Sequence, residues 1–435
     1  MPIRLVALSL TLCMAASAEA ARFRVTSGTM AVGDHVIAGD GRIVPRRRLV
    51  QSLGLLAGGM GGGRWTFTTD LRIAADAGLA DADARPRGVD ARTVDLQHGY
   101  LRGTGLMAGR LDLTLGRQLH WSASDLVAFD GAHVAVRGPY HLGAEAFSGL
   151  LVRREASWLG YSDLEPDGTA LSSEQSPTVG AGLMLHGLRR ASARAGWRRS
   201  WRGDRLSSER VHGAAEVRVL EAVRLQAAGS WDVSLERAEL ARIGWILHVE
   251  PGLQLGAEAA RVRPVFELDS IFPYFAGGPS DDLSATARQR VGRVVAHARA
   301  THRIFHGFEP DSSSSESESA RGGGGGLQVD IGGSSLVAAS GWAQRGYGGD
   351  WTSGMIQGAS HLFGEALEVD GRLRWTRFEA DLLSHLRGDA LQAMGGAGWW
   401  LTDVARFHLT FEADVTPFSA PSLRGFALLD LALWP

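Results

Sequence analysis

Arginines and carboxylates are the side chains with the greatest chemical capacity in this sequence, and they alternate with apolar residues. All 45 basic residues are Arg, because the sequence contains no Lys. A guanidinium group binds carboxylates and phosphates through two parallel hydrogen bonds, so a wet, Arg-rich surface can recognise anions. We predict that one polar face lines an aqueous pore through Asp70, Arg72, Asp112, Arg194, Arg198, Arg224, Asp232, Glu368, Asp370, Arg372, Arg374, Arg406 and Glu412, together with Arg117, which is treated separately below.

Arginines are densest between Arg190 and Arg205, where two arrangements are open. In the first, the guanidinium groups form a ladder that attracts anions, since rings of Arg in a pore favour anion passage. In the second, each Arg pairs with an acid on a neighbouring strand and the wall is neutral. The charges alone do not decide between the two arrangements.

No catalytic pattern accompanies these charges. The 14 His include no H-E-x-x-H pair, and the sequence has neither G-x-S-x-G nor a P-loop. Ser384 and His385 are adjacent, so on a strand they point to opposite faces. The formal charge of −2, from 45 basic and 47 acidic residues, excludes a strongly basic nucleic-acid binder. We therefore predict no enzyme activity, no cofactor, no metal and no nucleic-acid partner.

Short segments of alternating hydrophobicity must position the polar face. Between Ala405 and Val415, for example, apolar residues alternate with Arg406, His408 and Glu412, which is the period of a β-strand. A soluble sandwich also alternates, but Gly and Ala dominate the apolar sets here. Aromatic residues fall near segment ends, as in membrane girdles; they include Trp65, Tyr100, Trp342 and Trp351. The fold class that we predict is all-β: a single large antiparallel transmembrane β-barrel of about 18 strands, in a range of about 16 to 20.

The two ends of the chain carry different signals. Residues 1–20 have the pattern of a cleaved signal peptide that ends in Ala18-Glu19-Ala20, and the only cysteine, Cys13, lies within it. Residues 21–46 are predicted to be a periplasmic lead-in or the first strand region, and residues 47–435 the barrel. Residues 309–326, a Ser/Glu run followed by five Gly, are predicted to be a disordered loop.

The stretch Leu111–Gly131 carries a family resemblance. Its Gly116-Arg117-Gln118 and Phe129-Asp130-Gly131 resemble the "GRQ … DG" pattern of outer-membrane porins and alginate-export-type barrels. The resemblance implies a monomeric or trimeric barrel in the outer membrane of a Gram-negative bacterium. Such a barrel passes hydrophilic solutes or exports an anionic polysaccharide. Outer-membrane lipid, lipopolysaccharide and the barrel-insertion machinery are its expected partners, and an exporter would add periplasmic export partners.

Arg117 departs from the pattern because it shares parity with Leu111, Leu113 and Leu115. A regular strand would therefore aim it at lipid, at a cost of about 2–4 kcal/mol near the bilayer midplane. Either a β-bulge at Gly116 re-aims it into the lumen, or the strand ends there and Arg117 reaches the interface. We favour the bulge, which would make Arg117 and Asp130 a constriction pair.

Three functions fit these predictions. The first, which we favour, is a channel or exporter for hydrophilic solutes, possible cargo being carbohydrate or an anionic polysaccharide. The second is an adhesive barrel whose surface loops bind a partner. The third is a structural outer-membrane barrel with a closed lumen.

Overall fold

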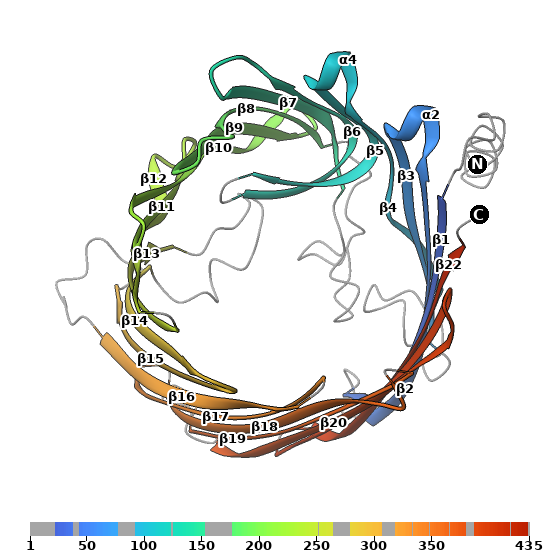
Figure 1. The fold of residues 1–435 in the computed structure, drawn as a ribbon, viewed down its shortest axis with the longest axis vertical. Coiled ribbons are helices and arrows are strands. Elements are labelled where there is room, and N and C mark those ends of the chain that lie inside the picture. Colours follow the sequence, from blue (N-terminus) through green and yellow to red (C-terminus); the bar gives the residue numbers. More distant parts are fainter. Residues whose placement is uncertain are drawn as a thin grey trace.

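The chain forms one closed β-barrel in the computed structural model (Figure 1). Twenty-two strands follow one another around the ring in chain order. The last strand pairs with the first in antiparallel register, for example Val25 with Leu431. Closure gives every strand two neighbours, so the sheet has no terminal edge strand, as a bilayer-spanning sheet requires. The predicted all-β antiparallel barrel is confirmed.

The strands are β1 (Arg22–Ile37), β2 (Ile43–Gly59), β3 (Trp65–Asp76), β4 (Arg92–Gly105), β5 (Leu111–Ser122), β6 (Asp125–Arg137), β7 (Leu142–Leu151), β8 (Pro177–Leu185), β9 (Ala191–Arg202), β10 (Arg205–Leu220), β11 (Val223–Asp232), β12 (Arg237–Glu250), β13 (Leu253–Val262), β14 (Ser280–Val291), β15 (Val294–Phe305), β16 (Glu318–Gly332), β17 (Ser335–Gly346), β18 (Asp350–Leu362), β19 (Leu367–Glu379), β20 (Arg387–Thr402), β21 (Ala405–Thr416) and β22 (Ser419–Leu433). Two four-residue helical turns, α2 (Met60–Gly63) and α4 (Leu106–Gly109), close the β2–β3 and β4–β5 connections.

The structure describes residues 22–37, 43–76, 92–122, 125–152, 176–250, 252–263, 279–306, 318–332, 334–347, 349–364, 366–379, 387–417 and 419–433. The predicted signal peptide and residues 309–317 of the predicted disordered loop lie outside these ranges. Residues 22–37 and 43–59, within or next to the predicted lead-in, form the first two strands.

The outer face of the wall is apolar and exposed. Val217, Leu225 and Trp245 face one another across three neighbouring strands and are 42%, 44% and 40% exposed. A continuous apolar surface of this kind is unfavourable in water and is the face that a bilayer covers. The neighbouring parity is polar: Glu216 is paired with Gln226. A closed barrel with this outer face is an outer-membrane protein, as the sequence resemblance implies.

The barrel has 22 strands, so the prediction of about 18 was wrong. The prediction assumed one long connection for every short one. The connections from odd-numbered to even-numbered strands lie at the end of the barrel where long loops were expected, but several of them are short as well. For example, only Gly203 and Asp204 separate β9 from β10. Shorter connections leave room in the same chain length for more strands.

The five-glycine run is a second source of the error. Gly322–Gly326, predicted to lie in a disordered loop, belong to β16 and pair with β15 on one side and β17 on the other. Glycine loses much conformational entropy in a strand, and composition alone therefore indicates disorder. Two flanking strands supply backbone hydrogen bonds along both edges of β16, which offsets that cost.

Candidate functional site

The tip of the hairpin made by β5 and β6 leaves the wall and lies inside the ring (Figure 1). β5 pairs with β4 only from Leu113 to Arg117. Further along β5, His120 lies six residues beyond Thr114, the residue that faces His133 in the ladder. Six extended residues span about 20 Å, yet the rings of His120 and His133 lie 4.7 Å apart. The hairpin therefore folds back over the inner face of the wall.

A row of glycines makes this bend possible. Gly116, Gly131 and Gly149 face one another across β5, β6 and β7. Gly116 has a φ of 118°, and a Cβ on Gly131 would overlap the carbonyl oxygen of Ser148. No register shift occurs at Gly116 in either ladder, so the predicted bulge is replaced by a bend of the paired strands. Only glycine permits so close an approach of three backbones.

Arg117 lies at the fork where β5 parts from β4. Its guanidinium binds the Asp130 carboxylate through Nε and Nη2, both at 2.7 Å. Its Nη1 donates to the carbonyl oxygen of Leu96 on β4 at 2.7 Å and lies 3.6 Å from Asp95. Arg117 thus forms the predicted pair with Asp130 and also binds the β4 backbone beyond the last β4–β5 pair. It lines neither cavity described below.

Aromatic packing holds the hairpin against the wall. Phe129 on β6 is completely buried, and its ring stacks on that of Phe147 on β7 at 5.0 Å between centroids. His120 lies 4.8 Å from the same Phe147 ring. Val127 and Leu151 complete the cluster. Burial of a Phe side chain contributes about 1.5–3 kcal/mol, so this cluster is a major source of hairpin stability.

A buried carboxylate joins three strands beneath the hairpin. Glu145 on β7, whose side chain is 5% exposed, accepts hydrogen bonds from Arg194 on β9 at 2.5–2.9 Å. The Arg194 Nη1 also donates to the carbonyl oxygen of Trp121, near the hairpin tip, at 2.8 Å. Glu145 lies 3.3 Å from His133 and 3.9 Å from His120. One arginine and one glutamate therefore connect the hairpin tip to the wall.

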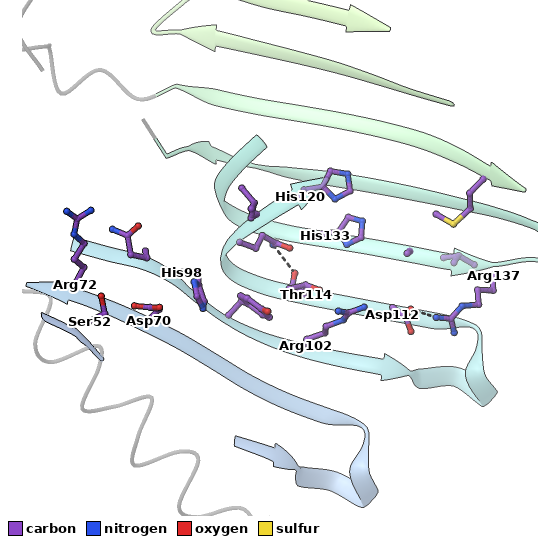
Figure 2. A pocket seen from close by; sticks show the side chains of 17 residues that line it. Ser52, Asp70, Arg72, His98, Arg102, Asp112, Thr114, His120, His133 and Arg137 are labelled. Atoms are coloured by element: carbon purple, nitrogen blue, oxygen red, sulfur yellow. Dashed lines mark hydrogen bonds and ion pairs between the residues drawn. The ribbon is translucent and has the colours of Figure 1, made fainter. Parts of the chain in front are cut away.

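A cavity of about 670 Å³ opens beside the hairpin (Figure 2). The predicted residues Asp70, Arg72 and Asp112 line it. Asp112 accepts hydrogen bonds from the Gly105 amide at 2.8 Å and from Arg137. Charges of both signs thus face one cavity, which suits polar solutes that carry either charge or both.

Sequence analysis did not single out several residues of this cavity. Its lining also includes His98, Arg102, His133 and Arg137, together with Tyr100, which sequence analysis placed in an aromatic girdle. The alternation along the strands would have identified these residues as inward-facing. On β6, His133 and Arg137 lie on the face opposite to Val134 and Val136. On β7, Glu145 and Phe147 alternate with exposed Ala144 and Ala146.

Two of the predicted arginines on β9–β11 pair with acids on other strands, as in the second arrangement. Arg194 binds Glu145, and Arg224 lies 3.4 Å from Glu216. Arg198 is buried, with Nη1 3.4 Å from the Ser200 hydroxyl. Asp232 is buried and accepts a hydrogen bond from the Leu235 amide at 3.0 Å, which places it in a turn at the rim.

The predicted residues of β19–β21 form a second set of pairs, far along the chain from the hairpin. Arg406 binds Glu368, Asp370 lies 3.6 Å from His408, and Glu412 lies 3.6 Å from Arg424 and accepts from Gln392. Arg372 lies 3.8 Å from the Met394 sulfur, and Arg374 is exposed. The structure does not bring this set together with Asp70, Arg72 and Asp112.

A second cavity, of about 710 Å³, lies against β12–β18. Trp342 and Trp351 line it, with ring centroids 6.2 Å apart. Both tryptophans, and Tyr100 in the first cavity, were predicted to lie in outer girdles and instead face cavities. A Cβ on Gly322 would lie 2.7 Å from the Trp342 ring, so the glycine strand lets this indole lie flat against the wall.

No helix among the described residues is long and apolar enough to cross a membrane. No protein-family model matches the sequence, and no curated protein sequence matches it significantly. Among solved structures, the ferric enterobactin receptor PfeA of Pseudomonas aeruginosa matches with a TM-score of 0.58 at 10% identity, covering 94% of this chain and 80% of the receptor chain. That likeness establishes a shared barrel fold.

Two porin-type structures match at lower TM-scores. A BenF-like porin from Pseudomonas fluorescens has a TM-score of 0.47 and 10% identity, covering 95% of this chain and 99% of the porin. OpdK from Pseudomonas aeruginosa, solved with vanillate, has a TM-score of 0.45 and 11% identity, covering 95% and 99% of the two chains.

Proposed function

We propose that this protein is an outer-membrane channel that passes small hydrophilic solutes, with anions among them. One observation carries the proposal: in the described residues, every strand belongs to the barrel sheet, and the part that turns inward is the tip of the β5–β6 hairpin, with a cavity lined by charged residues beside it. Barrels of this size in outer-membrane transporters commonly hold a plug. A hairpin narrows a lumen over part of its width and leaves a route beside it.

The cavity beside the hairpin supports a role in solute selection. Arg102 projects into it from β4 and is exposed, and no partner for it is seen among the described residues. Arg137, in contrast, is bound to Asp112. A guanidinium without a carboxylate partner recognises a carboxylate or phosphate on a passing solute. Export of a polysaccharide, which the sequence resemblance raised, has no support in the comparisons, and we do not propose it.

Conductance of the refolded protein in planar bilayers tests this function. We expect a steady open conductance and a small anion preference, because most described arginines of the inner face are paired with acids. Arg102→Ser should move the reversal potential toward cations. Arg345→Ser is the matched control, since Arg345 is 86% exposed and alternates with the cavity-lining Gln344, and it should leave the potential unchanged. A folded barrel without conductance would instead support the structural or adhesive function.

A further inference from the structure

We propose that His120, His133 and Glu145 form a binding site for a divalent transition-metal ion of the Zn²⁺ type, which fastens the β5–β6 hairpin to the barrel wall. The three side chains come from three adjacent strands, β5, β6 and β7. Their ligand atoms all lie within 4.8 Å of one another. The inward fold of the hairpin creates this group, because only the fold brings His120 back to the level of His133.

The spacing of the donor atoms fits a tetrahedral ion. Zinc binds His nitrogen and carboxylate oxygen at about 2.0–2.2 Å, which places neighbouring donors about 3.4 Å apart. The Nε2 of His133 lies 3.3 Å from one Glu145 oxygen, and the Nε2 of His120 lies 3.9 Å from the other. The second distance is too long for a hydrogen bond and closes by a small shift of the hairpin. Two imidazoles and one carboxylate leave a fourth position for water.

The surroundings of the three donors also suit a metal. Arg194 donates to both Glu145 oxygens, and a carboxylate that ligates a metal is usually held in place by such hydrogen bonds from an outer partner. Oε1 accepts from both Nε and Nη2 of Arg194, whereas Oε2 accepts from Nη2 alone, so the second lone pair of Oε2, on the side of His133, is the one available to the ion. A Cβ on Gly182 would lie 2.9 Å from Glu145 Oε1, so glycine provides the room in which this carboxylate lies.

The surroundings of the site give the ion a route from the lumen, and the donor atoms determine which kind of ion binds. His120 and His133 line the cavity beside the hairpin (Figure 2), which gives access from the lumen. Phe147 packs against His120 on the other side and excludes water there. Imidazole donors select Zn²⁺, Cu²⁺ or Ni²⁺ over Ca²⁺ and Mg²⁺, which prefer oxygen. The site therefore takes a first-row transition ion, and a bound ion would fix the hairpin in its inward position.

Calorimetric titration of the refolded full-length protein with Zn²⁺ in detergent tests the site. One zinc ion should bind per chain, and Ca²⁺ should not compete. His120→Gln and His133→Gln should each weaken binding by at least about tenfold, the loss that even outer-shell changes cause. His98→Gln is the control, because His98 lines the same cavity outside the group, and it should bind zinc as the parent does. An absence of binding, or equal binding by all variants, overturns the site.

Two further measurements keep the test decisive if a variant fails to fold. Co²⁺ bound to the unmodified protein should give the intense visible absorption of a tetrahedral site; its absence overturns the proposal. Zinc should also slow hydrogen exchange at the amides of Gln118–Trp121 in the hairpin, whereas unchanged exchange means that the ion does not fasten it. Both readouts are made without a bilayer gradient, so their outcome is independent of the channel function proposed above.

Discussion

The two cavity-bearing walls of the barrel use the same residue types in different environments. On the β5–β9 side, the Arg194–Glu145 pair lies beneath the hairpin, with side chains 30% and 5% exposed. Across the ring (Figure 1), the Arg303–Asp282 pair has similar geometry, at 2.6 and 2.7 Å, but its side chains are 48% and 27% exposed. The first pair holds the β5–β6 hairpin against the wall, whereas the second joins two neighbouring wall strands that are already paired through their backbones. Geometry alone therefore does not measure what an ion pair contributes.

Glycine shows the same contrast. Gly131 is required because the backbone of β7 occupies the space of its side chain. Gly322, on the far wall, lies under the Trp342 side chain, which is the nearest group to a Cβ at that position. In the first case glycine permits a bend of the sheet, and in the second it permits a flat aromatic surface. The following predictions test these differences, beginning with the largest effect.

Replacement of Gly131 by Ala should destabilise the barrel most. The added methyl group overlaps the Ser148 carbonyl, and the paired backbones must separate, at a cost of about 3 kcal/mol. Gly395→Ala is the control, because nothing lies within 4 Å of a Cβ at Gly395. The free energy of unfolding in urea and heat-dependent mobility in SDS measure both. Equal loss in the two variants would mean that the glycine row does not determine the bend.

Removal of the guanidinium that binds the buried Glu145 should have the next largest effect. Arg194→Gln leaves Glu145 charged and desolvated and frees the Trp121 carbonyl, so we expect a loss of about 2–3 kcal/mol. The equivalent change on the far wall, Arg303→Gln, should cost at most about 1 kcal/mol, since water screens an exposed pair. Urea unfolding midpoints give both values. If the two losses are the same, burial beneath the hairpin has no energetic role.

The smallest effect should follow Gly322→Ala. The new Cβ meets the Trp342 ring and the Thr301 hydroxyl, at 2.7 and 3.0 Å, and both are side chains that can shift. We expect a loss of about 1 kcal/mol and a change in single-channel conductance as the indole moves into the second cavity. A crystal structure of the variant would show the ring displaced from the wall. An unmoved ring would show that the glycines do not position it.

The sequence was sufficient to predict the class of fold and the two faces of the wall. Alternation is a local property, so the opposite environments of Leu225 and Gln226 follow from spacing alone. The number of strands did not follow, because the two-residue turn at Gly203 and Asp204 carries little signal and the pairing of Gly322–Gly326 depends on distant strands. Arg117 does pair with Asp130, since both belong to one short hairpin, whereas their predicted role as a constriction stays a prediction.

The inward fold could not be predicted in the same way. His120 meets His133 and Glu145 only because β5 parts from β4, and that separation depends on contacts among Gly131, Gly149 and the β7 backbone. Arg194 is 49 residues from Glu145 in the chain, and no local pattern links them. The predicted pore-lining roles of the other charged residues stay predictions until conductance is measured.

The short β4–β5 ladder has a mechanical consequence. Five residue pairs join these strands, whereas sixteen join β1 to β2. Under lateral tension the barrel should open first between β4 and β5, because fewer backbone hydrogen bonds resist the separation of these two strands. The β4–β5 connection is also a suitable site for new chain termini. A circular permutant that begins and ends within Leu106–Gly109 would break the chain between the two most weakly paired strands and leave the longer ladders unchanged.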